Sequence, residues 1–118
     1  MKKASETERI LSLLGLAKRA GRITAGVPLI CEKLRSPSPP DLVVIAEGAA
    51  ENAKKRLSDK CAFYRIRSLR IDADPAELAH ALGRADRVAG AAVSDKGLAR
   101  LIAPELFPDQ NNPHEKGA

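Results

Sequence analysis

The sequence predicts an α/β domain in which helices cover both faces of a small sheet. Residues 42–46 form a continuous aliphatic run, which is typical of a strand buried on both faces. Segments with helical apolar spacing alternate with short extended segments, and this alternation favours a layered α/β fold. With 118 residues, of which 44% are hydrophobic, the chain is long enough for one domain with its own core.

A capping box and an apolar stripe predict the first helix. Ser5 and Glu8 have the spacing at which an N-cap side chain and a glutamate bond reciprocally to the first turn. Gly21 is expected to end this helix, and residues 22–24 then form a short strand or extended link. The apolar residues that recur at helical spacing on one face are Ile10, Leu13, Leu14 and Ala17.

The remaining elements are predicted from turn residues, caps and apolar runs. A second helix begins near Gly26, because Pro28 fits a first turn, where its missing N–H costs nothing. Residues 1–103 are predicted to form one domain, and residues 104–118, which have little to bury, a flexible C-terminal tail. The elements expected after the second helix are a loop at 36–40, the strand at 42–46, a helix near 49–61, a strand at 65–71, a helix from Asp74 to Gly83, a strand at 88–93, and a last helix capped by Ser94 or Asp95 that runs to Ile102.

The formal net charge of +5 is unevenly spread along the chain. After Pro104 there are three acids and one base, so residues 1–103 carry a net charge of +7. A small basic domain fits a partner rich in phosphate, because clustered lysines and arginines release counterions on contact. The alternative is that the bases only keep the protein soluble. Aromatic residues make up 3% of the chain, which argues against recognition by base stacking.

Side chains that could carry catalysis or hold a metal are few. His80 lies mid-helix without a Cys, Asp or Glu at ligand spacing, and His114 lies in the tail. Cys31 and Cys61 fall inside predicted helices and are interpreted as core residues. The sequence contains no P-loop, dinucleotide fingerprint or nucleophile elbow. We therefore predict no catalytic residue, no metal, no cofactor and no enzymatic activity.

Three basic or glycine-containing segments could instead bind a polyanion. The first leads from Lys18 through Arg22 to Gly26, where a helix N-terminus would offer backbone N–H groups to a phosphate. The second is Gly48, at the end of the buried strand and beside a basic helix. The third is the loop 84–88. If the strand ends meet, these segments form one basic, glycine-lined edge; otherwise they are three unrelated turns.

The same segments resemble the L-seven-Ae/L-thirty-e ribosomal-protein family, whose members bind kink-turn RNA, and most closely its small bacterial YlxQ-type members. The resemblance covers approximately residues 8–103 and rests on the order of several short motifs. It implies a three-layer α/β/α sandwich around a mixed four-stranded sheet. The matching motifs are residues 14–21 (LGLAKRAG), Gly26, residues 43–47, residues 59–61 (DKC) and residues 92–97 (AVSDKG).

The resemblance also implies roles for individual residues. Family members read guanines with polar side chains that follow the glycine matching Gly26, but this chain has Pro28 and Leu29 there. Backbone and shape recognition is therefore expected in place of guanine-specific contacts, with phosphates held near Gly26 and Lys33 and Val88 packed on an extruded base. The predicted RNA-binding residues are Lys18, Arg19, Arg22, Gly26, Val27, Pro28, Lys33, Gly48, Lys54, Arg84, Ala85, Asp86, Arg87 and Val88.

We predict a cytoplasmic, monomeric RNA-binding protein of the ribosome or translation machinery, whose partner is structured, kink-turn-like RNA. The pair of cysteines indicates a reducing compartment, and no apolar run is long enough to span a membrane or act as a signal peptide. The main alternative is a protein-interaction module that keeps the fold but has lost guanine-specific readout. A recognition domain of an RNA-modifying enzyme is a third possibility.

Overall fold

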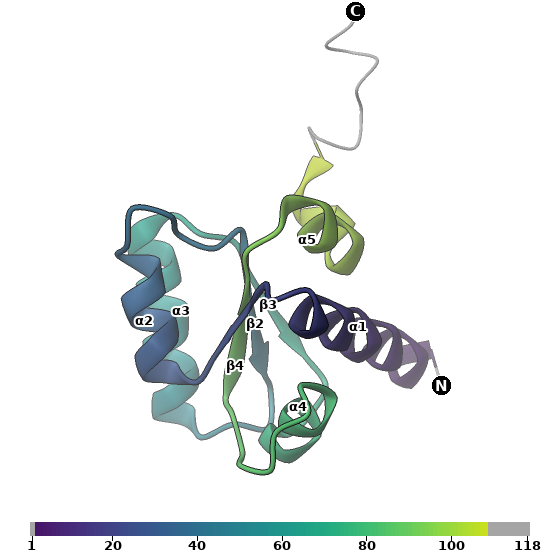
Figure 1. The fold of residues 1–118 in the computed structure, drawn as a ribbon. Helices are drawn as coiled ribbons and strands as arrows, with labels where there is room; N and C mark the ends of the chain where they lie inside the picture. The colour runs from purple at the N-terminus through teal and green to yellow at the C-terminus, as the bar shows by residue number, and fades with distance from the viewer. Residues whose placement is uncertain (1, 109–118) are drawn as a thin grey trace, which may run out of the picture.

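The computed structural model describes residues 2–108, with side chains from residue 6 onward (Figure 1). Within these residues the chain alternates helices and short strands, as the sequence predicts. None of the described helices is long and apolar enough to cross a membrane. The elements are α1 (Lys2–Arg19), β1 (Ile23–Ala25), α2 (Val27–Leu34), β2 (Leu42–Ala46), α3 (Glu51–Tyr64), β3 (Ser68–Ile71), α4 (Pro75–Ala81), β4 (Gly90–Val93), α5 (Lys96–Ile102) and the 3-10 helix η1 (Pro104–Leu106).

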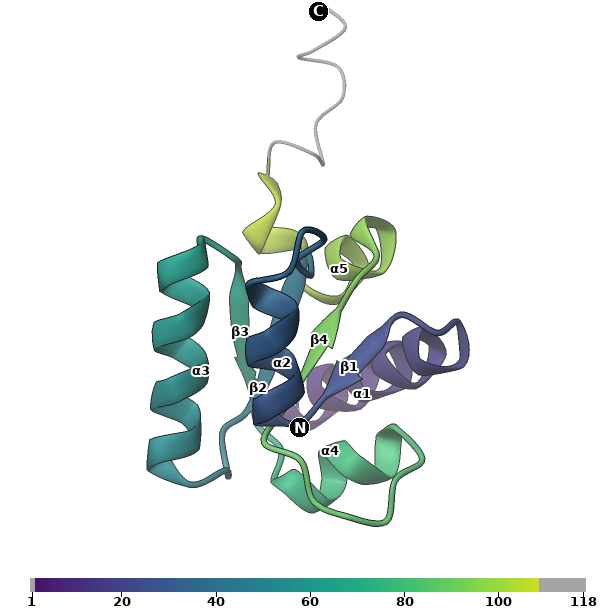
Figure 2. The same cartoon turned by 60° about the vertical axis from the view of Figure 1, so that its left-hand side comes forward.

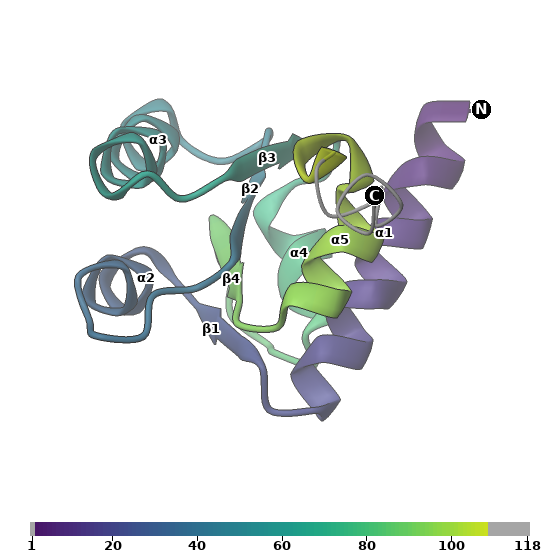
Figure 3. The same cartoon turned by 90° about the horizontal axis from the view of Figure 1, so that it is seen from above.

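The four strands form one mixed sheet in the order β1-β4-β2-β3. Strands β2 and β3 are parallel, whereas β4 runs antiparallel to both of its neighbours. Helices α2 and α3 cover one face of this sheet, and α1, α4 and α5 cover the other (Figure 3). The predicted three-layer α/β/α sandwich with a mixed four-stranded sheet is confirmed.

The aliphatic run of β2 separates the two halves of the core. All five of its residues are buried, because strand side chains alternate between faces and both faces are covered. Leu42 and Val44 belong to the apolar cluster that contains residues of α1, α4 and α5. Val43 and Ile45 belong to the cluster that contains residues of α2 and α3. Each half of the core is therefore built on alternate residues of one strand.

Gly90, the first residue of β4, lets two layers approach closely. A Cβ atom there would lie 2.8 Å from the backbone oxygen of Val44 and 2.9 Å from Cδ1 of Leu57. Both distances are shorter than real Cβ contacts. The glycine therefore allows β4 to lie close to β2 and α3 to pack on the sheet there, because a Cβ atom would clash first with the backbone of β2.

Helix α1 ends as predicted but begins earlier. After Arg19, the N–H of Gly21 donates to the carbonyl of Lys18 at 3.0 Å, and that of Arg22 donates to Ala17 at 2.9 Å. With Gly21 at φ 75°, these bonds form a Schellman cap. The predicted N-cap, Ser5, lies inside the helix. The preceding Lys-Lys-Ala segment consists of good helix formers, so the capping-box spacing does not mark the helix start.

Other element ends shift by a few residues. Helix α3 begins at Glu51 and continues to Tyr64, three residues beyond the expected end, and β3 starts at Ser68 instead of at 65. The predicted cap of α4 is confirmed: Asp74 and Glu77 form a capping box. Of the two candidates for α5, Asp95 is the cap, with its carboxylate accepting the N–H of Leu98 at 2.8 Å.

The folded part of the chain extends past the predicted domain end at residue 103. The segment after it forms η1, and Phe107 is buried at 4% exposure in the core that α1, α4 and α5 share. The guanidinium of Arg67 lies 4.6 Å from the centre of the Phe107 ring. The predicted tail therefore contains an apolar anchor in its first residues, because Leu106 and Phe107 supply surface to bury. The rest of that tail, residues 109–118 with His114, lies outside the described residues.

Candidate nucleic-acid interface

Parts of all three predicted segments meet at one end of the sheet. These parts are Gly26, Gly48 and the loop 84–89, and we call this end of the sheet the glycine end. The N–H of Gly26 donates to the carbonyl of Gly90 at 3.2 Å, and the N–H of Ala46 donates to Ala89 at 2.8 Å. Strands β1 and β2 finish there and β4 begins there, because β4 is antiparallel to both. Figure 2 shows the start of α2 and the loops before α3 and β4 at the same end.

A hollow of about 480 Å³ lies beside the outer edge of β1 and carries two of the predicted cations. Lys33, from α2, and Arg84, from the loop after α4, both line it. Within residues 2–108, β1 is an edge strand, and its far side has no strand partner. The hollow therefore combines two cationic side chains with an open strand edge. Its other lining residues are Ile23, Thr24, Ala25, Leu29, Glu32 and Ser36.

The start of α2 offers backbone and apolar surface. Gly26 caps the helix with φ 94°, a conformation that favours glycine, and makes no side-chain capping bond. Val27 packs partly against the core between α2 and the sheet. Pro28 is exposed, and Leu29 is 53% exposed. No side chain from Gly26 to Leu29 can donate or accept a hydrogen bond, so the side chains of this segment cannot read base edges.

The loop after α4 carries its own counter-ion. Arg84 contacts Asp86 through two hydrogen bonds, from Nε at 3.1 Å and from Nη2 at 2.9 Å. Hydrogen bonding to Asp86 raises the pKa of Arg84, and the same contact lowers the pKa of Asp86. The charge of Arg84 is therefore offset within the loop. Ala85 and Arg87 are exposed beside this pair.

Val88 is not available to an RNA base, contrary to expectation. It is 4% exposed and belongs to the core cluster, and its N–H donates to the carbonyl of Pro75 at 3.3 Å. From the sequence it could be placed at the end of an exposed loop. In the structure it is the residue that anchors this loop to the start of α4, which is why an apolar side chain stands there.

Lys54 is also unavailable to RNA, because its side chain is held by contacts within the protein. Its side chain is 9% exposed, and Nζ donates to the carbonyl of Glu47 at 2.9 Å. Nζ also lies 3.2 Å from a carboxylate oxygen of Glu51 and 3.3 Å from one of Glu47. Hydrogen bonding to Glu51 raises the pKa of Lys54, against the lowering effect of burial. The lysine therefore joins the end of β2 to the first turn of α3, and its charge does not face a partner.

Replacing Lys54 with methionine is expected to destabilise the fold. The carbonyl of Glu47 would lose its bond, and two carboxylates would lose their shared cation. Urea denaturation should show a lower midpoint with an unchanged slope. Lys55→Met is the matched control, because the Lys55 side chain is 77% exposed and pairs only with the exposed Asp59. Equal midpoints for the two variants would contradict this role.

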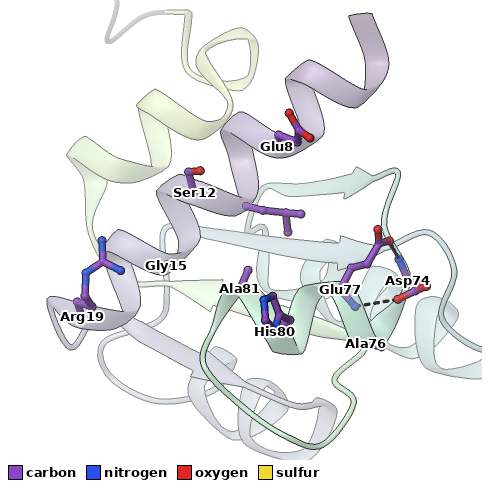
Figure 4. Close-up of a pocket in the computed structure, with 10 residues that line it drawn as sticks. Glu8, Ser12, Gly15, Arg19, Asp74, Ala76, Glu77, His80 and Ala81 are labelled. Atoms are coloured by element: carbon purple, nitrogen blue, oxygen red, sulfur yellow. Dashed lines mark hydrogen bonds between the residues drawn. The ribbon is translucent and has the colours of Figure 1, made fainter. Parts of the chain in front are cut away.

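The basic corner after α1 does not join the glycine end. The carbonyl of Arg22 accepts the N–H of Ser94 at 2.9 Å, which places Arg22 where β4 finishes. Lys18 and Arg19 are exposed, and Arg19 lines a groove between α1 and α4 with Ser12 and His80 (Figure 4). The three residues of β1 separate this corner from Gly26. The cations of the corner therefore lie farther from the start of α2 than their closeness in the sequence suggests.

The charge of the glycine end differs from the expectation. Exposed carboxylates surround it: Glu47 and Glu51 follow β2, and Asp74 lies against Gly48, whose Cβ would approach within 3.0 Å of it. The predicted glycine-lined edge therefore exists, but it is not basic throughout. Among the described residues, Arg70 also lies at this end, 3.4 Å from a carboxylate oxygen of Glu47, and the loop from Arg84 to Arg87 adds cations on the side that faces β1.

The cysteines lie in the core, as the sequence predicts, in the layer formed by α2 and α3. Cys61 is 1% exposed and Cys31 is 9% exposed. Burial, with a smaller contribution from Cys31, raises the pKa of the Cys61 thiol to about 11 from its ordinary value of 9.0. A buried, protonated thiol is a poor nucleophile. Among the residues that the structure describes, no group of three His, Cys, Asp or Glu side chains could hold a metal ion.

The raised pKa predicts a pH dependence of stability. The folded state holds the Cys61 proton up to about pH 11, whereas the unfolded thiol releases it near 9.0. The stabilisation from this thiol is therefore complete below pH 9 and is lost as the pH rises toward 11. The free energy of unfolding should fall less between pH 8 and pH 10.5 in Cys61→Ala than in the wild type. Parallel pH profiles would refute this assignment.

Sequence reasoning missed part of the hollow. Thr24 and Ser36 line it with hydroxyl groups, and Glu32 adds a carboxylate. These residues meet around one hollow because α2 lies along β1. The spacing of residues within one element does not reveal how two elements pack. A hint was present in α2 and the residues just after it, because Leu29, Glu32, Lys33 and Ser36 recur at helical spacing.

Comparisons with known proteins agree with the fold and the motifs. The sequence model of the ribosomal protein L7Ae/L30e/S12e/Gadd45 family matches residues 8–103. The RNA-binding protein YlxQ of Bacillus subtilis (strain 168) is 34% identical over 90 residues, which cover 76% of this chain and 87% of that protein. The RNA-binding protein YlxQ of Enterococcus faecium is 30% identical over 93 residues, covering 79% of this chain and 86% of that protein.

Solved structures show the same architecture. A protein with unknown function from Bacillus halodurans C superposes with a TM-score of 0.72 at 32% identity, covering 81% of this chain and 94% of that one. The Giardia lamblia 15.5kD RNA binding protein superposes with a TM-score of 0.70 at 16% identity, covering 85% and 83%. The family match spans most of the chain and includes the strand, cap and glycine motifs described above. The chain is therefore a member of the ribosomal protein L7Ae/L30e/S12e/Gadd45 family.

Proposed function

We propose that this protein binds structured RNA through its backbone and shape, at the hollow beside β1 and the start of α2. The observation that carries the proposal is the placement of Lys33 and Arg84 around one hollow next to Gly26. Cations around an open backbone edge suit phosphates, while the start of α2 has no side chain that can read base edges. Membership of a family whose relatives include proteins named as RNA-binding supports the same partner.

The finer parts of the proposal concern the RNA and its setting. We propose a kink-turn-like fold as the RNA, because a bent backbone can present phosphates to the hollow and to Arg87 together. The protein would act as a cytoplasmic monomer associated with the ribosome or the translation machinery, and as a binding protein without catalytic activity. Of the predicted residues, Gly26, Pro28, Lys33, Arg84, Ala85 and Arg87 remain in this proposed site.

A salt titration of binding tests the proposal. Filter binding is measured with a kink-turn RNA and with an unstructured RNA of the same length, from low to moderate salt. We expect tighter binding of the kink-turn RNA and a linear fall of log K with log salt concentration. Equal affinity for the two RNAs would remove structured-RNA recognition. The absence of binding to either would refute the RNA proposal.

One observation favours a second candidate function. Leu29 is 53% exposed next to the exposed Pro28, and the glycine end carries the carboxylates of Glu47 and Glu51. An exposed apolar step at a helix start suits a protein surface better than a polyanion. Size-exclusion chromatography with light scattering separates the two: an RNA-free oligomer that Leu29→Asp dissociates would favour protein interaction, whereas a monomer agrees with the first proposal.

A further inference from the structure

A second group of cations lies at the end of the sheet opposite the glycine end. Arg65, Arg67 and Lys96 line one hollow of about 150 Å³, with Asp41 as the single carboxylate among its lining residues. We call these three side chains the Arg65 cluster. They come from the loop between α3 and β3 and from the first residue of α5. The cluster belongs to none of the segments that the family resemblance assigns to RNA.

The hydrogen-bond ladder fixes the location of this cluster. The N–H of Val43, near the start of β2, donates to the carbonyl of Arg67 at 3.0 Å. The N–H of Asp41 donates to Val93, the last residue of β4, at 2.8 Å. The cluster therefore lies where β2 and β3 begin and β4 finishes, whereas the glycine end lies where β2 finishes (Figure 1). One RNA contact cannot account for both ends.

Two of the three cations stand where local structure disfavours them. Arg65 caps α3 in the left-handed conformation, at φ 59°, and it is the only non-glycine residue with positive φ among those described. Glycine is the favoured residue at that position. Lys96 is the first residue of α5, where the helix dipole favours an anion over a cation. Strain and unfavourable charge placement at one hollow indicate a role other than folding.

The third cation is held rigidly in place. The Nε of Arg67 donates to the carbonyl of Leu106, and its guanidinium lies 4.6 Å from the centre of the Phe107 ring. Arg67 as a whole is nevertheless exposed. A guanidinium fixed by one N–H and by a stacked ring is preorganised for a bidentate contact with phosphate oxygens.

An exposed aromatic side chain lies two residues from the cluster. Phe63, in the last turn of α3, is 76% exposed, the highest value among the large apolar residues of the described region. Its ring contacts that of Tyr64 edge to face, with the ring centres 4.9 Å apart. At 76% exposure, Phe63 is accessible to a base. Because Phe63 precedes Arg65 by two residues, a strand held by the cluster could stack one base on its ring.

We infer that the Arg65 cluster and Phe63 form a second RNA-contacting surface, which takes a single-stranded segment through its phosphates and one base. The inference rests on the proposed RNA-binding function but concerns a different surface. Phosphodiesters fit three cations around one small hollow, and the open ring beside them fits an unstacked base. With both ends occupied, the protein holds a structured RNA element at the glycine end and a single strand at the other.

The double variant Arg65→Gly/Lys96→Gln tests the surface without threatening the fold. Glycine suits the left-handed position, and glutamine removes a charge that the helix dipole opposes, so thermal unfolding should show equal or higher stability. The probe is a uridine oligonucleotide of roughly ten residues. We expect its affinity at low salt to fall at least about tenfold, and the slope of log K against log salt to fall by about 1.4 for two lost phosphate contacts.

Lys55→Gln/Arg56→Gln is the matched control, because it removes the same charge from exposed positions in the middle of α3. This control should leave most of the affinity and slope intact, while Phe63→Ala should weaken uridine binding roughly fivefold or more. If the two double variants bind uridine RNA equally, the surface takes no RNA and the inference fails. If the wild type binds neither uridine RNA nor kink-turn RNA, the proposed function itself fails.

Discussion

Gly90→Ala is expected to lower the free energy of unfolding by about 1–3 kcal/mol, the range typical of an overpacked core. The added methyl group would lie 2.8 Å from the backbone oxygen of Val44 and 2.9 Å from Leu57. The side chain could turn aside, but the backbone of a central strand cannot. For a domain of this size, the loss corresponds to a melting temperature lower by roughly 5–15 °C in a thermal scan.

A fall in the free energy of unfolding would be informative, because replacing glycine with alanine usually raises it. Alanine restricts the unfolded chain, and where the native backbone accepts it the protein gains stability. Gly97→Ala is a suitable control: its Cβ would meet only a side-chain oxygen of Asp95, at 3.3 Å, at an exposed position. We expect a much smaller change there. A Gly90→Ala protein as stable as the wild type would show that the layers are not in such close contact.

The double charge reversal Lys33→Glu/Arg84→Glu is expected to abolish most RNA affinity at moderate salt. Both side chains line the hollow beside β1, so the variant turns its two cations into anions next to Glu32. Two lost phosphate contacts should also reduce the slope of log K against log salt by about 1.8 for helical RNA. Filter binding with kink-turn RNA across a salt series measures both quantities. An unchanged slope would exclude the hollow from the interface.

Asp86→Asn, in the same loop as Arg84, is expected to have the opposite effect on RNA affinity. Asparagine keeps the size of the side chain but removes the carboxylate that offsets Arg84. The freed guanidinium should then contact phosphate more strongly, so affinity for kink-turn RNA should rise severalfold, with a steeper salt dependence. Weaker binding by this variant would mean that the ion pair shapes the loop for RNA instead of competing with it.

Much of the fold could be predicted because its signals are local. The buried strand at 42–46 is set by its own aliphatic residues, and the cap at Asp74 by Glu77 three residues later. Element ends were less certain, since they depend on residues outside the element. Helix α3 continues to Tyr64 because Arg65 adopts the left-handed conformation of the helix cap. An arginine at this position does not predict that conformation.

The site was harder to predict, because it depends on which neighbours a side chain finds. Lys54 has the sequence context of an exposed helix lysine, yet the carbonyl of Glu47 and two carboxylates surround it. Val88 lies in a charged loop but packs in the core. Arg22 is four residues from Gly26 and nevertheless lies at the opposite end of the sheet. Each misplacement comes from tertiary contacts that no spacing along the chain encodes.

The strand order has a consequence for how the chain assembles during synthesis. Of the strands that the structure describes, β4 is the last to be made, but it lies between β1 and β2 and is the one that pairs with β1. Until residues 90–93 leave the ribosome, β1 lacks the partner it has in the described sheet, and of the strand pairs in that sheet the nascent chain can form β2–β3. The core therefore closes in one late step, and a chain that stops before residue 90 would expose its apolar layers to chaperones and proteases.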